Sequence, residues 1–515
     1  MSAAVLQDNE VLLKLNTPTP NSSSQICCIL SRPIGEDTLR AAILMHGMGS
    51  HKNSIFIPKL ARKLSEQENM YVIRFDFRNC GDSTKTGSFG RTLQNDIEDI
   101  SVVYDYLSSG GFEGKKLFVD TLVGHSRGVV DVFNWQLQNK GKFVPNLVAC
   151  AGRFLGSGLI NNIKKAHSDY EEVGGHYIKG FQDGKYTDVW IPIKESMSLG
   201  TLNMEIVREI TPHSNTLCLY GSRENVIPLE DAAMYVNALR ERNTFVIIPN
   251  ADHCFFGVDK IPENEWETSS KPIKNGVIDY NFEVADLLAN WISSKTMQER
   301  FYERTKNIHR FLPRWKSIKD ANVRDIGGFN TSTGKIVKYG SIFRSDDLSK
   351  VSQHELQTLG IEKVFDLSIE GSTNSAPLVS TESLIKEKLP ATLFSDKKHL
   401  QDNYVNVLSK LIQSCKPLFD HIIDVQTPVL YYCSNGRDIS GLVTLVLLRV
   451  AGVDPLLAAQ EYSLSKPNSD SYVHFSHVLP VLNTLRDDEA VSNLLATALS
   501  VSQDRQSALR AALQL

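Results

Sequence analysis

The chain has 515 residues, more than one hydrophobic core usually organises, so we expect two domains. Its 55 basic and 59 acidic residues give a net charge of -4, which argues against a nucleic-acid partner. We expect no membrane span, because the longest apolar run, 441–453, contains Arg449 and is shorter than the required ~18 residues. The first residues lack a basic segment followed by an apolar core, so they predict no secretory signal and a cytoplasmic protein.

The eight cysteines form no CxxC pair and no cluster with histidine at the spacing of metal ligands. This pattern is typical of buried thiols in a reducing compartment. We therefore expect no metal site, and since no motif elsewhere implies an organic cofactor, we expect none.

The first half of the chain alternates between two kinds of pattern. Two short apolar runs within 11–33 predict opening strands, and the later runs AAILM, YVIRFDF, LFVDTLVG, NLVACAG, NTLCLYG and NTFVIIP predict further strands. Amphipathic helical patterns lie between these runs, which favours an α/β fold with a parallel sheet covered on both faces. Residues 153–210 are more polar and interrupt the alternation. We expect an α/β domain over 1–295 with residues 153–210 as a cap.

A second α/β pattern follows a charged helical segment. Residues 296–315 are predicted to be a helical linker. Beyond it come the strand KVFDL, one long amphipathic helix over 404–425, and the strand PVLYYC followed by an apolar helix. We expect a second domain over 316–490 and a loosely packed helical tail over 491–515.

The segment Gly-His-Ser-Arg-Gly at 124–128 fits the pattern G-x-S-x-G, with a predicted strand before it and a helix after it. Such a turn holds a serine in a strained backbone conformation, and glycines are needed where side chains would clash. The pattern predicts Ser126 as a nucleophile, with the amide of Arg127 at the start of the helix facing a developing oxyanion.

Three further residues fall where a serine hydrolase would need them. Met48, in HGMG after the strand AAILM, is expected to supply the second oxyanion amide. Glu224 follows the strand NTLCLYG, and His253 follows the last strand, which gives the chain order Ser, acid, His. A solvated surface carboxylate at Glu224 and a structural loop histidine at His253 are the alternative interpretations.

The motifs HGMGSHKNS, RFDFRNCGDS, GHSRG, AGRF, GSRENVIPLEDA and ADHCFFG resemble, in order, those of α/β-hydrolase esterases of the serine-aminopeptidase-like and cinnamoyl-esterase-like group. The resemblance implies Ser126 as nucleophile, His253 as general base and Glu224 as acid, acting on a small-molecule carboxylic ester or thioester. Two positions depart from the group: Glu224 stands where Asp is usual, and Asn79 where Gly is usual.

The motifs ANVRDIGGFN, SIFRSDDL, KVFDLS and YYCSNGRDISGL resemble the tyrosine-phosphatase-like domain of bacteria and fungi, which is built around a Cys-x5-Arg loop. The resemblance places the nucleophile position at Cys433 and matches the loop residues Gly436, Asp438 and Ser440. The essential arginine position, however, is Ile439, and the usual histidine and strand-end arginine are Tyr432 and Ser368.

Loss of that arginine removes the bidentate phosphate anchor of such a loop. We therefore expect a degenerate phosphatase domain with a regulatory or scaffold role, whose partner is a phosphorylated ligand or protein. The alternative is a working phosphatase or a phosphate-binding signalling protein in which Arg437 replaces the missing guanidinium and Asp396 or Asp402 is the general acid. A plain buried thiol is a further interpretation of Cys433.

Overall fold

The computed structural model describes residues 6–18, 24–35, 38–85, 90–182, 184–308, 315–346, 348–349, 351–368, 381–383, 400–433, 436–465 and 475–515. The chain divides into two compact units. The N-terminal unit comprises 1–140 and 144–297, and the C-terminal unit comprises 141–143 and 298–515.

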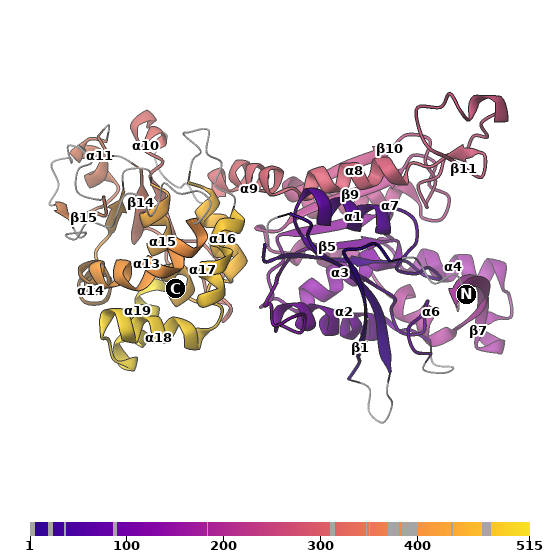
Figure 1. Ribbon diagram of the computed structural model, residues 1–515, viewed down its shortest axis with the longest axis horizontal. Coiled ribbons are helices and arrows are strands. Elements are labelled where there is room, and N and C mark those ends of the chain that lie inside the picture. Colours follow the sequence, from indigo (N-terminus) through magenta and orange to yellow (C-terminus); the bar gives the residue numbers. More distant parts are fainter. Residues whose placement is uncertain are drawn as a thin grey trace. The chain divides into compact units, whose positions relative to one another are not determined.

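An eight-stranded sheet forms the centre of the N-terminal unit (Figure 1). Its strand order is β1-β2-β4-β3-β5-β6-β9-β10. The pairs β1–β2 and β2–β4 are antiparallel and all the others are parallel. The strands are β1 (Glu10–Asn16), β2 (Gln25–Ser31), β3 (Arg40–Met45), β4 (Tyr71–Phe75), β5 (Phe118–His125), β6 (Asn146–Cys150), β9 (Asn215–Gly221) and β10 (Asn243–Ile248).

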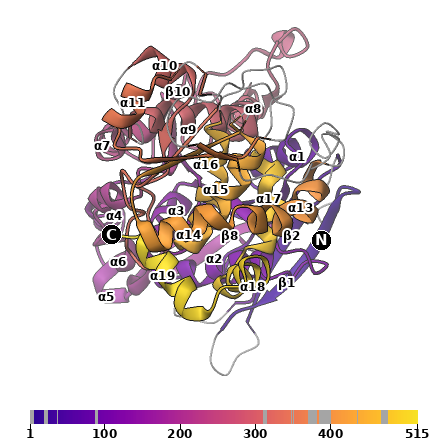
Figure 2. The same ribbon diagram turned by 90° about the vertical axis from the view of Figure 1, so that its left-hand side faces the viewer.

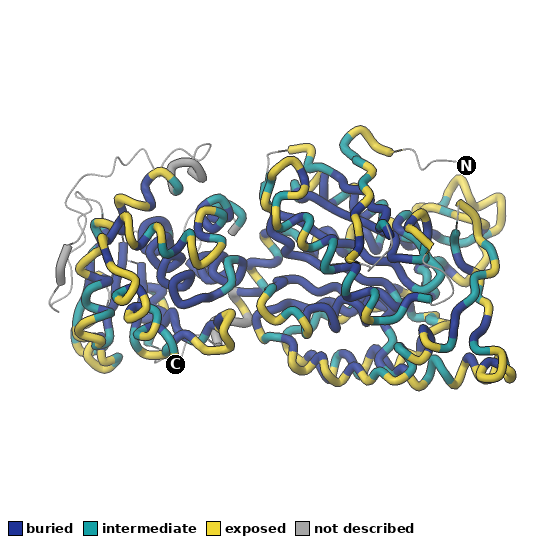
Figure 3. Tube along the Cα trace, turned by 90° about the horizontal axis from the view of Figure 1, so that it is seen from below, coloured by how far each residue is buried: buried dark blue, intermediate teal, exposed yellow. Residues whose placement is uncertain are grey.

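Helices cover both faces of this sheet. Helices α1 and α8 pack together on one face, and α2 and α3 pack on the other (Figure 1). Helix α7 joins α3 through a stacked pair of rings, Phe133 and Tyr235. The central strands are buried, as Figure 3 shows in dark blue. The predicted α/β-hydrolase fold is confirmed by this topology; the helices are α1 (Ile57–Gln67), α2 (Leu93–Ser108), α3 (Arg127–Gln138), α7 (Leu229–Leu239) and α8 (Asn281–Ile292).

Between β6 and β9 the chain leaves the sheet, and we call this inserted segment the cap after its predicted role. The antiparallel hairpin β7–β8 and several short helices make up this segment. Its elements are α4 (Ser157–Ala166), α5 (Tyr170–Val173), β7 (Gly175–Gln182), β8 (Lys185–Pro192), α6 (Ile193–Gly200) and η1 (Met204–Glu209). The rest of the unit contains η2 (Arg240–Arg242), η3 (Glu263–Glu265), β11 (Ile273–Lys274) and β12 (Val277–Ile278).

The C-terminal unit contains a five-stranded sheet of order β13-β14-β17-β15-β16. Only the β13–β14 pair is antiparallel, and β17 lies at the centre of the sheet. The strands are β13 (Arg324–Asp325), β14 (Ile342–Ser345), β15 (Lys363–Asp366), β16 (Thr381–Ser383) and β17 (Val429–Tyr432). The α/β class predicted for this half is confirmed.

Helices account for most of the remaining described residues of this unit, and several of them, from α13 to α19, are labelled in Figure 2. Among the described residues of the whole chain, no helix has both the length and the apolar composition needed to cross a bilayer. The helices are α9 (Ser294–Ile308), α10 (Lys316–Asp320), α11 (Gln353–Thr358), α13 (Leu400–Ser414), α14 (Lys416–Asp420), η4 (His421–Val425), α15 (Asp438–Val450), α16 (Pro455–Ser463), η5 (Phe475–Val478), α17 (Leu479–Thr484), α18 (Asp488–Leu499) and α19 (Gln503–Leu513).

The structure corrects the single helix expected over 404–425. Three shorter helices, α13, α14 and η4, occupy this stretch, and the first break falls at Cys415. Pro417 lies in the first turn of α14. Proline has no amide hydrogen to donate and its ring clashes with the preceding turn, so it is tolerated at a helix start but not in a helix interior.

The structure also corrects the expectation of a loosely packed tail. Leu495 of α18 and Leu509 and Leu513 of α19 are buried. Helix α19 lies beside η4 and α14 (Figure 2), and Arg505 donates to Asp420 at 2.8 Å. Leu509 and Leu513 are four residues apart and lie on one face of α19, and burial of that face holds the tail in place.

Candidate active site

Ser126 occupies the turn between β5 and α3. Its backbone has φ = 54°, a left-handed conformation that is uncommon for any residue except glycine. The neighbouring glycines have steric causes: a Cβ on Gly124 would lie 2.2 Å from the carbonyl oxygen of Gly128, and one on Gly47 would lie 2.9 Å from the Ser126 Cβ. The G-x-S-x-G sequence therefore forms the tight turn that it predicts.

Glu224 and His253 are in contact. The distance between Glu224 Oε2 and His253 Nδ1 is 2.9 Å, and the amides of Val226 and Ile227 donate to Glu224 Oε1 at 2.9 and 3.1 Å. Burial alone would raise the pKa of Glu224, but these hydrogen bonds outweigh it and the pKa is lowered. The Glu224 side chain is 0% exposed, so it is not a solvated surface carboxylate.

Asp252, which is adjacent to His253, is directed elsewhere. Its Oδ1 accepts the amides of Cys254 and Phe256, both at 2.9 Å. Of these two carboxylates, Glu224 is therefore the one that contacts His253 Nδ1.

His125 connects the Ser126 turn to the His253 loop. Its Nε2 donates to the carbonyl oxygen of His253 at 3.0 Å, and the two rings lie 4.9 Å apart. Burial and the nearby His253 lower the pKa of His125 to about 3, so this ring is neutral near pH 7. Among the described residues no hydrogen bond joins the Ser126 hydroxyl to His253, and such contacts are often long in enzymes without substrate.

The amides predicted to face an oxyanion come from two separate segments. Arg127 begins α3, and Met48 follows β3 in a turn. The first amides of a helix have no acceptor within the helix, and here neither amide has an acceptor among the residues that the structure describes. Ser126 and both residues line the same cavity.

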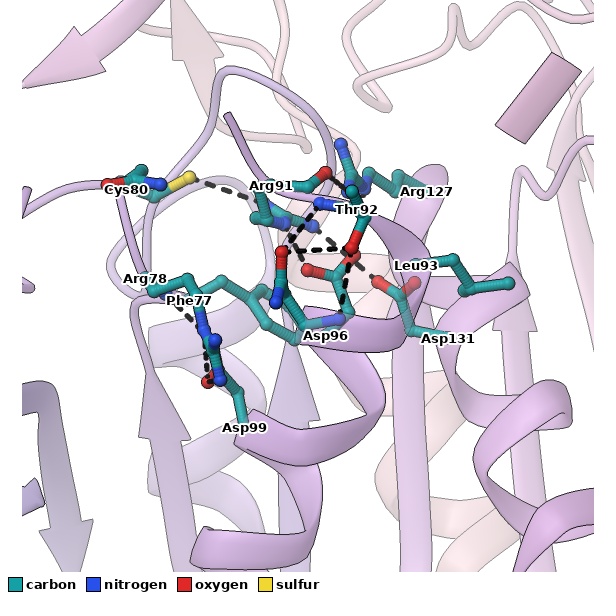
Figure 4. Close-up of polar contacts among 12 residues, drawn as sticks. Phe77, Arg78, Cys80, Arg91, Thr92, Leu93, Asp96, Asp99, Arg127 and Asp131 are labelled. Carbon is teal, nitrogen blue, oxygen red and sulfur yellow. Dashed lines mark hydrogen bonds and ion pairs between the residues drawn. The ribbon is translucent and has the colours of Figure 1, made fainter. Parts of the chain in front are cut away.

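The Arg127 side chain belongs to a buried network of charges (Figure 4). Asp96 accepts hydrogen bonds from Arg127 Nε at 2.9 Å and from Arg91 Nε at 2.5 Å. Arg127 also donates from Nη1 to a carboxylate oxygen of Glu195. Arg91 also lies 3.6 Å from Asp131. Burial and, after it, the adjacent Asp96 raise the pKa of Asp131 well above its usual value.

The cap contributes one residue, Glu195, to this network of charges. It lies on α6, and besides binding Arg127 it accepts the backbone amide of Arg91 at 2.7 Å. The cap is thus tied to the residue whose amide faces the predicted oxyanion. Sequence reasoning missed Glu195, because no local pattern relates a residue of the cap to one 68 positions earlier.

Two cavities adjoin these elements. A largely apolar cavity of about 120 Å³ contains Ser126 and includes Phe154, Leu159, Leu199 and Leu202 in its lining. A second cavity, of about 320 Å³, lies along the β7–β8 hairpin and is lined in part by Cys80, Arg91 and Glu195.

A cluster of potential metal ligands is occupied by the ammonium group of a lysine, Lys52. Cys27, Asp76 and Asp82 bring one ligand atom each within 4.8 Å of one another. Lys52 Nζ, however, binds the carboxylates of Asp76 at 2.6 Å and Asp82 at 2.5 Å. Through Lys52, this cluster joins the loop after β4 to the loop after β3.

In the C-terminal unit, β17 delivers Cys433 to the start of α15 at the carboxyl end of the sheet. The Cys433 Sγ lies 3.3 Å from Ser440 Oγ. Gly436 has φ = 58°, and a Cβ there would lie 1.7 Å from the carboxylate of Asp346. Arg344 donates to the Gly436 carbonyl oxygen at 2.7 Å and holds this part of the loop.

The position that should hold arginine is buried and apolar, because Ile439 is 5% exposed. The Arg437 guanidinium donates to Asp438 at 3.0 Å. The remaining loop residues, 434 and 435, and the side chains of Asp396 and Asp402 lie outside the described residues. Cys433, Gly436, Arg437, Asp438 and Ser440 are therefore brought together, and the apolar Ile439 stands at the position where the resembling family has its arginine.

A protein of Saccharomyces cerevisiae, the uncharacterized protein YDL057W, is 30% identical over 311 residues, which cover 56% of this chain and 93% of the yeast protein. The chain belongs to the same family as this yeast protein.

Other comparisons concern the two units separately. Residues 317–514 match the Tyrosine phosphatase family, a range that includes α18 and α19. Similar solved structures include Est1E from Butyrivibrio proteoclasticus (14% identity, 56% of this chain, 98% of that chain, TM-score 0.39). Another is the esterase domain of a Rhodothermus marinus protein (17% identity, 56% of this chain, 98% of that chain, TM-score 0.37). A third is an alpha-beta serine hydrolase homologue from Coxiella burnetii (16% identity, 56% of this chain, 99% of that chain, TM-score 0.35).

Proposed function

We propose that the N-terminal unit is a serine hydrolase that cleaves carboxylic esters or thioesters of small molecules. The observation that carries this proposal is the 2.9 Å contact between Glu224 and His253, on the loops after β9 and β10. Ser126, in its strained turn beside the same cavity as Met48 and Arg127, supplies the nucleophile.

In the proposed reaction, Ser126 Oγ attacks the ester carbonyl carbon while His253 Nε2 takes the hydroxyl proton. The amides of Met48 and Arg127 stabilise the resulting oxyanion. The intermediate collapses to an acyl-enzyme, and the departing alcohol receives the proton from His253. Water then repeats the sequence on the acyl-enzyme and releases the acid. Glu224 stays ionised and fixes the His253 tautomer.

Ser126→Ala is expected to abolish labelling by a fluorophosphonate and turnover of short aryl esters, because the alanine has no oxygen that could form the covalent bond. Gel fluorescence after labelling of the full chain, and release of 4-nitrophenol from its acetate, measure the two effects. Ser222→Ala, which removes a hydroxyl that accepts the Asn250 amide away from the cavity, is the control. Labelling of Ser126→Ala at the wild-type level would reject this nucleophile.

For the C-terminal unit we propose a phosphatase fold without phosphatase turnover, which acts as a regulatory or scaffold domain. The apolar Ile439 supports this proposal, because its side chain cannot donate to phosphate oxygens. The position of Cys433 beside Ser440 favours the competing function, a working phosphatase.

Wild-type full-length protein and Cys433→Ser are expected to give the same background release of 4-nitrophenol from its phosphate, because no guanidinium balances the charge of the transition state. Ile439→Arg is expected to gain measurable binding of vanadate by calorimetry. Wild-type turnover that disappears in Cys433→Ser would establish the phosphatase and direct attention to Arg437.

A further inference from the structure

Arg153 brings a guanidinium to the otherwise largely apolar cavity that contains Ser126. The residue follows β6, and its backbone is fixed because Tyr235 donates to its carbonyl oxygen at 2.9 Å. The side chain is half-buried, and its Nη2 donates to the carbonyl oxygen of Val226 at 2.8 Å. A cation is thus held beside the proposed nucleophile by neutral contacts.

The charge of Arg153 has no matching carboxylate in the described part of the chain, where no ion pair to it is found. Two carboxylates, Asp231 and Glu224, interact with Arg153 electrostatically but form hydrogen bonds with other groups. Asp231 accepts the Phe154 amide at 2.8 Å, and Glu224 binds His253. Burial lowers the pKa of Arg153, yet an arginine stays protonated in proteins. A partly desolvated cation of this kind is stabilised when a ligand brings the opposite charge.

The volume and the apolar lining of the cavity limit what the rest of the ligand can be. An apolar cavity of ~150 Å³ lined by Leu, Ile and Phe holds a benzene molecule, so a space of about 120 Å³ holds a short alkyl segment. We propose that the substrate of the Ser126 site is an ester whose short acyl chain ends in a carboxylate, and that Arg153 binds this carboxylate. The inference rests on the proposed function and names its substrate class.

Paired substrates test this inference on the full-length protein. The 4-nitrophenyl monoester of adipic acid carries the carboxylate, and the corresponding ester whose second acid group is a methyl ester does not. We expect kcat/KM of the wild-type protein to be about 10- to 100-fold higher for the anionic ester, the size of one charge-assisted contact. In Arg153→Gln this ratio is expected to fall to about 1, and in Arg153→Lys to an intermediate value, because lysine cannot bind a carboxylate in a bidentate manner.

The ratio of the two rates is independent of the fraction of folded protein, so a partly unfolded variant still gives an answer. Arg208→Gln is the matched control, because it removes one positive charge from the exposed surface of the cap, and it is expected to keep the wild-type ratio. Equal rates for the two esters in the wild type, or a ratio that survives in Arg153→Gln, would overturn the role of Arg153. Absence of both fluorophosphonate labelling and turnover would instead overturn the proposed function.

Discussion

Glu224→Gln is expected to lower kcat about 10³–10⁴-fold with little change in KM. The glutamine amide can donate to His253 Nδ1, which favours the wrong tautomer of the ring, and it cannot stabilise the imidazolium that forms during the reaction. Substrate contacts are untouched, so the loss falls on the chemical step. Steady-state kinetics with a short aryl ester at pH 7.5 measure the effect.

Two further variants, one conservative and one a control, test the interpretation of this result. Glu224→Asp keeps the charge and restores the residue usual in the resembling group, so it is expected to retain more activity than Glu224→Gln. Glu230→Gln makes the same chemical change at an exposed position of α7 and is expected to leave kcat unaltered. Near-normal kcat in Glu224→Gln would require another carboxylate to orient His253.

Asp96→Asn is expected to lower the free energy of unfolding of the N-terminal unit by about 3–5 kcal/mol. Asp96 is fully buried and binds both Arg91 and Arg127, so its neutralisation leaves two buried guanidinium groups facing one fewer carboxylate. Removal of one partner from a buried ion pair is strongly destabilising, because the other charge stays buried without compensation. Urea denaturation followed by tryptophan fluorescence reports mainly this unit, since four of the five tryptophans lie in it and the fifth, Trp315, lies in the C-terminal unit.

The control for this prediction is the exposed ion pair between Glu113 and Arg32, whose side chains are 49% and 40% exposed. Glu113→Gln makes an equivalent change from acid to amide on the surface. It is expected to alter the free energy of unfolding by at most ~1 kcal/mol. Equal effects of the two substitutions would show that the buried network has no special energetic weight.

The sequence predicted the strands well because their apolar runs are continuous and local. The runs before Ser126 and before Glu224 became β5 and β9, two parallel strands on either side of β6. Since parallel strands end at the same edge of a sheet, the order of the motifs already indicated which residues meet there. The departure at Asn79 is also accommodated, because its φ of 65° is tolerated by asparagine.

Contacts between distant segments could not be predicted in this way. The pairing of Glu195 with Arg127 depends on the path of the cap over the sheet, which no periodicity encodes. The break at Cys415 was missed because the apolar pattern continues through it, while the proline two residues later determines the backbone. The burial of α19 was missed because a small number of leucines, rather than a long apolar run, holds it in place.

The bond between Glu195 and Arg127 bears on attempts to redesign the specificity of this protein. Exchange of residues 157–209 for the corresponding segment of another hydrolase would remove one of the two carboxylates that bind Arg127, and with it the acceptor of the Arg91 amide. A graft chosen only for the shape of its binding surface would then carry a stability defect unrelated to the new ligand. A chimaera that retains a glutamate at the position of Glu195, or that replaces Arg127 with a neutral residue at the same time, separates these two properties.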